Sequence, residues 1–234
     1  MTWLLWKEYR QNRAILWVLL FLLLLPYLIV LIAVGHSYLR HEMLLRDWRE
    51  TFCAVSLFSI GLSQIAIALI GGYAIAGERA DRSAEFQAYL PIPRYKTLAA
   101  KLLLTLIMTA VIWLPNLAVC CTLEYSFGGN NLQPSPMAIM HAFFSTAIVG
   151  LTFFGVAWFV SSFLRSPAIA VCAGLVAPLF VLGGLFFIDY LFDLKLDDGS
   201  DAPLFVLWTI ICLAALAAIG FVVGTWIAWR RVEP

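Results

Sequence analysis

Six long runs without a charged residue determine what this chain can fold into. Only 12% of its 234 residues are charged and 63% are hydrophobic, whereas soluble domains carry about 25% charged residues. We predict membrane spans over about 14–35, 52–77, 102–123, 141–164, 167–188 and 203–229. Each run reaches the roughly 20 residues that a helix needs to cross a bilayer. The sequence therefore predicts an all-α integral membrane protein with six transmembrane helices in a single transmembrane domain, 1–234.

The segment before the first run, 1–13, mixes basic and aromatic side chains. These are Lys7, Arg10 and Arg13, and Trp3, Trp6 and Tyr9. On a helical wheel the two kinds interleave, which is typical of an interfacial segment at the level of lipid headgroups. The pattern fits poorly to a surface helix with one polar and one apolar face. The run that follows exceeds the about 7–15 apolar residues of a signal peptide, so we expect an uncleaved first span.

Basic residues are distributed unevenly among the segments between the spans. Eleven of the 15 Lys and Arg residues lie in segments on the same side as the N-terminus, and four lie on the other side. Cytoplasmic segments carry the excess of Lys and Arg in membrane proteins. We therefore predict that both termini and the polar segment 78–101 face the cytoplasm. The loop 189–201 on the opposite side is acidic, with five Asp residues.

The segment Glu78–Lys101 is a long polar stretch with a strong positive bias. We predict that Glu78–Leu90 forms a short cytoplasmic helix, in which Glu78 and Arg82 pair at a spacing of four residues. Two prolines, Pro91 and Pro93, end this helix because their rings do not permit the next turn of hydrogen bonds.

The predicted helix has one apolar stripe, made by Phe86, Tyr89 and Leu90. A charged helix with such a stripe could rest on lipid headgroups or enter a groove on a soluble partner. A solvated loop that only fixes the topology is the third interpretation. The stripe and the double proline favour a docking element, since neither is needed for topology.

No pattern in the sequence is typical of a catalytic, metal or nucleotide site. Gly72 and Gly77 have the spacing of a phosphate-binding loop, but Glu78 stands where a Lys is required. The His and Cys residues show no metal-ligand spacing. The interiors of the spans contain no Asp, Glu, Lys or Arg, which argues against an intramembrane hydrolase and an ion-coupled transporter. We therefore expect no catalytic residue, no metal site and no cofactor in this chain.

Polar and small residues within the spans suggest helix contacts. Gln64 and Asn116 could contact a substrate along a transport path or hydrogen-bond a neighbouring helix. Gly220 and Gly224 in the last span, and the small residues Ala68, Gly72 and Ala76 in the second, permit close approach of backbones. Packing within one subunit is the first interpretation of these residues, and a seam between two copies is the second.

The central segment resembles the loop between spans two and three in the permeases of type-2 ABC exporters. The matching positions are an acidic-basic pair at the end of span two, an acid seven residues on, a Pro-x-x-Arg and a Lys that opens span three. Here they are Glu78-Arg79, Glu85, Pro91-Ile-Pro-Arg94 and Lys101. The sequence departs from the family at mid-loop, where Arg82-Ser83 replaces the usual Gly-Thr, and at Pro93. With the six spans and the N-terminal segment, the resemblance covers essentially the whole chain.

The resemblance implies a permease subunit of an ATP-driven exporter. Such permeases work as pairs, as a homodimer or a heterodimer, with two copies of a separate ABC ATPase, so the chain itself would be no enzyme. The implied coupling residues are Glu78, Arg79, Glu85, Phe86, Tyr89, Leu90, Pro91, Arg94 and Lys101. The protein would lie in a bacterial-type cytoplasmic (inner) membrane. The lipid bilayer would be a further partner, and we expect no nucleic-acid partner. The alternative is a non-transporting assembly or immunity factor that uses the same six-helix scaffold.

Overall fold

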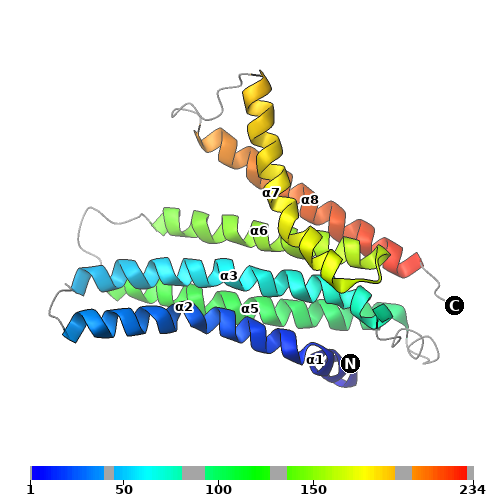
Figure 1. Ribbon diagram of the computed structural model, residues 1–234, viewed down its shortest axis with the longest axis horizontal. Helices are drawn as coiled ribbons and strands as arrows, with labels where there is room; N and C mark the ends of the chain where they lie inside the picture. The colour runs from blue at the N-terminus through cyan, green and yellow to red at the C-terminus, as the bar shows by residue number, and fades with distance from the viewer. Residues whose placement is uncertain (1, 40–44, 81–92, 127–135, 193–201, 231–234) are drawn as a thin grey trace. The chain divides into compact units, whose positions relative to one another are not determined.

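The computed structural model describes residues 2–39, 45–80, 93–126, 136–192 and 202–230. Within these ranges the chain forms helices and no strand (Figure 1). A short helix, α1 (Thr2–Gln11), comes first. The six long helices are α2 (Arg13–Leu39), α3 (Leu45–Ala80), α5 (Arg94–Ser126), α6 (Pro136–Phe163), α7 (Pro167–Phe192) and α8 (Ala202–Arg230). The predicted all-α architecture is confirmed.

All six long helices are long and apolar enough to cross a membrane. They contain the six predicted spans, apart from Leu164, which follows the last residue of α6. Two helices begin well before their apolar runs, α3 at Leu45 and α5 at Arg94. Charged residues can continue a helix beyond the hydrocarbon, so hydropathy alone does not show where these helices start. The six-helix prediction is confirmed.

The connection between α6 and α7 is a tight turn of three residues, 164–166. Its sequence explains the break, because Pro167 has no N–H to continue a helix but suits the first helical position. The carbonyl oxygen of Ser166 accepts the first hydrogen bond of α7, from the amide of Ala170 at 3.4 Å. A tight turn therefore joins α6 directly to α7.

The described chain divides into two compact units. Unit 1 comprises Met1–Ala66 and Leu102–Thr146, and unit 2 comprises Ile67–Lys101 and Ala147–Pro234. Three helices, α3, α5 and α6, contribute residues to both units.

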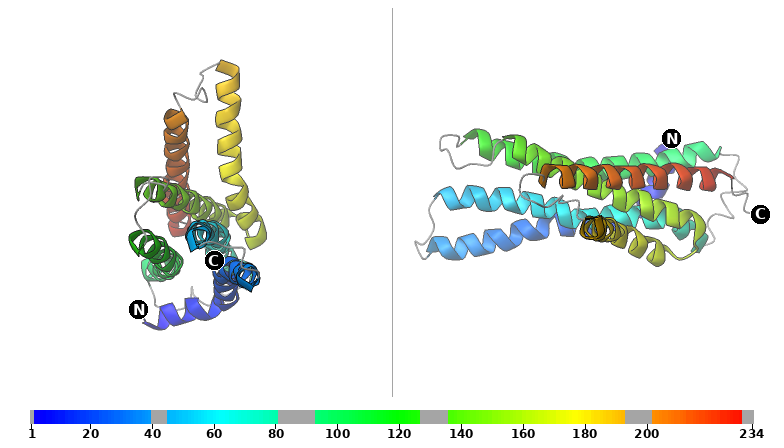
Figure 2. Two further views of the ribbon diagram at one scale, coloured as in Figure 1. Left: turned by 90° about the vertical axis from the view of Figure 1, so that its left-hand side faces the viewer. Right: turned by 90° about the horizontal axis from the view of Figure 1, so that it is seen from above.

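Unit 1 holds α1, α2 and most of α5, with the first part of α3. The helices α2 and α3 lie side by side (Figures 1 and 2), and the hydroxyl of Ser59 in α3 donates a hydrogen bond of 2.7 Å to the carbonyl of Leu23 in α2. The rings of Trp113 in α5 and Phe143 in α6 meet edge to face at 5.9 Å. Unit 1 is therefore held by polar as well as apolar contacts between its helices.

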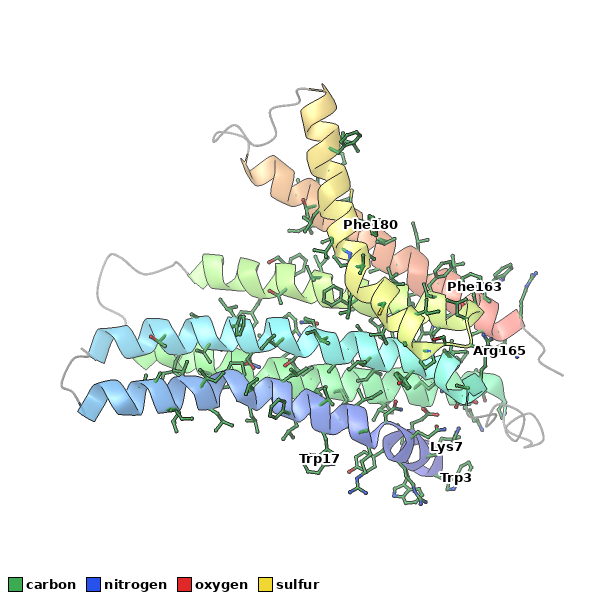
Figure 3. All side chains as sticks on the ribbon, in the orientation of Figure 1. Trp3, Lys7, Trp17, Phe163, Arg165 and Phe180 are labelled. Carbon is green, nitrogen blue, oxygen red and sulfur yellow. The ribbon has the colours of Figure 1, made fainter. Side chains whose placement is uncertain are left out.

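The N-terminal segment forms a true helix, α1, with a narrow buried face. Leu4 and Glu8, four residues apart, are buried. The aromatic side chains Trp3, Trp6 and Tyr9 are exposed, and the guanidinium of Arg10 lies 5.5 Å from the centre of the Trp6 ring. Figure 3 shows Trp3 projecting away from the ribbon. Basic and aromatic residues thus share one exposed face, as their interleaved order predicts.

Unit 2 is built on close contacts at glycines. A Cβ atom on Gly155 in α6 would lie 2.5 Å from the carbonyl oxygen of Ala217 in α8, and one on Gly220 would lie 2.8 Å from the carbonyl oxygen of Gly155. A Cβ atom on Gly224 would meet the Trp158 ring at 2.8 Å. Gly220 and Gly224 therefore pack against α6 of the same chain, which is the first of the two interpretations of this motif.

Close contacts at glycines also join α7 to its neighbours in unit 2. A Cβ atom on Gly72 of α3 would lie 2.5 Å from Cγ2 of Val171, and one on Gly174 would lie 2.8 Å from the carbonyl oxygen of Phe153. The flanking small residues of α3, Ala68 and Ala76, are fully buried. At such distances no side chain larger than hydrogen fits, so these residues fix how closely the helices of unit 2 approach.

Candidate coupling site

The end of α3 carries the first two residues of the predicted coupling segment. The helix continues through Ala80, so Glu78 and Arg79 occupy its last turn. The structure does not describe 81–92, and the predicted residues Glu85, Phe86, Tyr89, Leu90 and Pro91 lie there, outside the described residues. The predicted helix Glu78–Leu90, its pair between Glu78 and Arg82 and its apolar stripe therefore stay predictions.

Glu78 forms an ion pair with Lys101, the residue at the other end of the segment. The Lys101 Nζ lies 2.9 Å from Glu78 Oε1, and only 6% of the lysine side chain and 13% of the glutamate side chain are exposed. The same Nζ donates a hydrogen bond to the carbonyl of Ala74, one turn earlier in α3. An unpaired buried charge is costly, and a partner of opposite charge with a further hydrogen bond offsets much of that cost. The pair thus joins α3 to the first part of α5.

Arg79, the next residue, reaches a third helix of unit 2. Its Nη1 donates a hydrogen bond of 2.9 Å to the carbonyl of Ser162. Ser162 lies in the last turn of α6, where backbone carbonyls have no partner within the helix. A guanidinium at this position satisfies one such carbonyl and opposes the partial negative charge of the helix end. Arg79 therefore acts as a C-terminal cap for α6.

Arg94 is the first residue of α5, and the structure describes its backbone alone. The carbonyl of Pro93, just before it, accepts a hydrogen bond of 2.9 Å from the amide of Lys96. The proline therefore directly precedes the first turn of α5. Of the nine predicted coupling residues, the structure brings together Glu78, Arg79 and Lys101 in one cluster of charged side chains.

The sequence contains little that predicts this cluster of Glu78, Arg79 and Lys101. Lys101 stands at the start of an apolar run, where a lysine commonly extends towards the headgroups. In the structure it is the eighth residue of α5 and its ammonium group turns towards α3 instead. The available signal is positional: consecutive spans joined by one polar segment bring their ends together, so opposite charges at 78 and 101 can meet.

Asn116, the second polar residue singled out within the spans, joins two helices of unit 1. Its Oδ1 accepts a hydrogen bond of 2.5 Å from the hydroxyl of Tyr27, and its Nδ2 donates one of 2.6 Å to the carbonyl of Ile112. With both ends of the amide bonded and 1% of the residue exposed, this geometry matches the interpretation of a contact between neighbouring helices.

Gln64 differs from Asn116 in this respect. The residue is 1% exposed, yet neither amide atom has a hydrogen-bond partner within the part of the chain that the structure describes. A buried amide without a hydrogen bond is costly, and polar groups at membrane depth are often functional. Gln64 therefore stays a candidate for a polar contact along a transport path.

Comparison with known proteins identifies the family. Residues 2–192 match the family model described as "ABC-2 family transporter protein". The chain belongs to the ABC-2 transporter family. No curated protein and no solved structure matches it.

The family membership confirms the resemblance drawn from Glu78-Arg79 and the residues that follow. A permease of the ABC-2 family is the membrane-spanning component of an ABC transporter and pairs with a separate ABC ATPase subunit. The six apolar helices make this ABC-2 permease an integral, multi-pass membrane protein. Within the described ranges, no group of three or more His, Cys, Asp and Glu side chains could hold a metal ion.

Proposed function

We propose that this ABC-2 permease couples ATP hydrolysis by its partner ATPase to export of a substrate across a bacterial-type cytoplasmic membrane. The observation that carries the proposal is the cluster of Glu78, Arg79 and Lys101, which ties the two ends of segment 78–101 to each other and to α6. A segment that transmits a conformational change of a partner protein must be held firmly against the spans that move. A loop that only fixes the membrane topology needs no such contacts with the spans.

The proposed docking element is the part of the segment between Glu78 and Arg94. Phe86, Tyr89 and Leu90 enter a groove on the ATPase, and burial of one large apolar side chain contributes about 1.5–3 kcal/mol. The prolines at 91 and 93 return the chain to α5 with little freedom, because their φ angles are fixed. Closure of the ATPase on ATP then pushes the segment, and the spans respond.

The proposed orientation places the N-terminus, the segment 78–101 and the C-terminus in the cytoplasm. The eleven basic residues on this side support it. The exposed aromatic residues of α1 suit the headgroup region of a bilayer, and so does the guanidinium of Arg230, which lies 4.4 Å from the centre of the Trp226 ring. A second permease copy, identical or different, completes the transporter.

The proposal is tested by two measurements on the intact permease in its own membrane. Cysteine at Ser83 should react with a membrane-impermeant thiol reagent added from the cytoplasmic side, and cysteine at Ser200 should react from the outside. Tagged permease in detergent should co-purify with a protein that carries a G-x-x-x-x-G-K-[ST] motif. Reversed labelling overturns the orientation, and failure to recover an ATPase favours the non-transporting scaffold.

A further inference from the structure

The charged residues at the two ends of the coupling segment contact each other and other parts of the permease. We propose that Glu78 and Lys101 form an internal brace that holds the ends of the segment together, and that Arg79 links this brace to α6. The three are positioning residues, which transmit the movement of the segment and do not bind the ATPase themselves. The inference rests on the proposed function and names the parts that carry the movement.

Burial separates a brace from a docking contact. A docking residue must present its charge to a soluble partner, but 6% of the Lys101 side chain and 13% of the Glu78 side chain are exposed. The lysine ammonium is held by two acceptors on α3, the carboxylate of Glu78 and the carbonyl of Ala74. An ATPase could reach these charges only by breaking the pair. The charges therefore act within the permease.

The pair also closes the segment into a loop. Glu78 is at the end of α3 and Lys101 is in α5, and the 2.9 Å contact holds them together whatever the chain between them does. When the segment is pushed, its two ends cannot separate, so α3 and the first part of α5 move together. Without the pair, the force would spread the two helices apart and part of the movement would be lost.

Arg79 extends the connection to the rest of unit 2. Through the carbonyl of Ser162 it holds the end of α6, and α6 packs on α8 at Gly155 and Gly220 with backbones in contact. Packed helices with no space between them cannot slide independently. Movement that enters at the brace therefore passes through α6 to α8, and through Gly174 to α7.

The brace itself is tested without an ATPase. Thermal unfolding in detergent is compared for the wild type, Glu78→Gln, Lys101→Met and the double variant. Groups in one ion pair give non-additive effects, so the double variant should melt no lower than the worse single variant. Additive losses would show that the two side chains do not form a pair, and would overturn the proposal even if the permease recruits its ATPase.

The role in coupling is tested on the complex with its ATPase. A cysteine replaces Arg165, in the exposed turn after α6, in a background without the five native cysteines. Its rate of reaction with a maleimide is measured without nucleotide and after trapping with ATP and vanadate. For the wild-type brace we expect at least a tenfold difference between the two states. Glu78→Gln and Lys101→Met should reduce that difference to less than threefold, while each still binds the ATPase within threefold of the wild type.

The exchanged pair Glu78→Lys with Lys101→Glu distinguishes the two roles. The exchange keeps the ion pair but loses the bond from residue 101 to the Ala74 carbonyl, so it should restore part of the maleimide response that either single variant loses. A docking contact would present reversed charges to the ATPase and lose binding at least tenfold. If the exchanged protein fails to fold, the variant Glu78→Leu with Lys101→Met replaces it. Normal binding of the ATPase together with loss of the maleimide response supports the brace. Loss of ATPase binding in that variant overturns it. A wild type that recruits no ATPase refutes the proposed function instead.

Discussion

The hydroxyl of Tyr27 lies 2.5 Å from Oδ1 of Asn116, and each of these residues directly follows a proline inside its helix. Pro26 cannot donate to the carbonyl of Leu22, and Pro115 cannot donate to that of Val111. The next carbonyl along accepts a side-chain hydrogen bond in each case: Ser59 of α3 donates to Leu23, and Asn116 donates to Ile112 of its own helix. The proline-containing points of α2 and α5 are therefore tied to each other by a hydrogen bond, and the carbonyl that follows each freed carbonyl accepts a side-chain hydrogen bond.

This relationship predicts a measurable coupling between α2 and α5. Tyr27→Phe removes the hydroxyl and keeps the ring, and Asn116→Leu removes the amide. Hydrogen bonds between membrane helices contribute about 0.6 kcal/mol on average and up to about 1.7 kcal/mol. We expect each variant to lose stability, with a coupling energy near the upper value because the bond is short and Asn116 is buried. A double-mutant cycle on unfolding in mixed micelles measures it.

The control for that cycle is Thr122→Val. Thr122 is exposed and donates to carbonyls of its own helix, those of Ala118 and Val119. Its loss should be additive with Tyr27→Phe, since the hydroxyl of Thr122 donates within its own helix. An additive result for Tyr27 and Asn116 as well would contradict the tie between the helices.

The amide of Gln64, which has no hydrogen-bond partner among the described residues, leads to a prediction of opposite sign. Removing a buried polar group that has no hydrogen bond relieves a desolvation cost of about 1–3 kcal/mol. Gln64→Leu should therefore raise the unfolding temperature, whereas the same type of change at Asn116 lowers it. The two variants are each other's control, measured by thermal unfolding in one detergent. A lower unfolding temperature for Gln64→Leu would mean that the amide is bonded in the protein.

The sequence predicts the six helices of this protein but few of the contacts between them. An uncharged run of the right length can satisfy its backbone in lipid only as a helix, so the spans follow from composition alone. The partner of a given side chain depends on how helices far apart in sequence are rotated. The sequence shows Asn116 as a polar residue within a span, but it does not show that Tyr27, 89 residues away, is its partner.

The same reasoning explains what was and was not predicted at the coupling site. The resemblance to a family pattern identifies Glu78, Arg79 and Lys101 and fixes their positions along the chain. It does not predict their contacts, because the pairing expected for Glu78 rests on helix spacing within one segment. The observed pair crosses from α3 to α5 and leaves the carboxylate facing the interior of unit 2.

The glycine contacts of unit 2 predict strong intolerance of larger residues. Gly155→Ala places a methyl group 2.5 Å from the Ala217 carbonyl oxygen, and overpacking of this kind costs about 1–3 kcal/mol. We expect a lower unfolding temperature and a reduced yield of folded protein. Gly183→Ala in α7 is the matched control, because no atom of the described residues lies within 4 Å of its Cβ position. Alanine also favours the helix over glycine by about 1 kcal/mol, so this variant should be neutral or more stable.

Equal effects at Gly155 and Gly183 would contradict the packing of α6 on α8. A loss at both positions would indicate that α7 is also packed there in the protein. An unchanged unfolding temperature for both variants would indicate that the backbones of α6 and α8 are further apart than in the structure. There a Cβ atom on Gly220 would lie 2.8 Å from the Gly155 carbonyl oxygen.

The apolar stripe of the coupling segment gives the prediction that separates the two functional interpretations. If Phe86 and Leu90 enter a groove on the ATPase, Phe86→Ala with Leu90→Ala removes two side chains worth about 1.5–3 kcal/mol each. Since 1.4 kcal/mol corresponds to a factor of ten, the double variant should bind the ATPase at least tenfold more weakly. The measurement is a detergent pull-down with the tagged permease, titrated with purified ATPase. Lys195→Ala, in the loop predicted to face the opposite side, serves as the control and should bind normally.

The stripe variant and the brace variants should differ in what they lose. Phe86→Ala with Leu90→Ala reduces binding, because it removes the surface that docks. Glu78→Gln keeps binding and loses the response in the turn after α6, because its carboxylate acts inside the permease. Normal binding by the stripe variant would exclude these side chains as the docking contact and leave them to the lipid headgroups. Loss of binding in both kinds of variant would mean that the ATPase recognises the whole segment, its charged ends included.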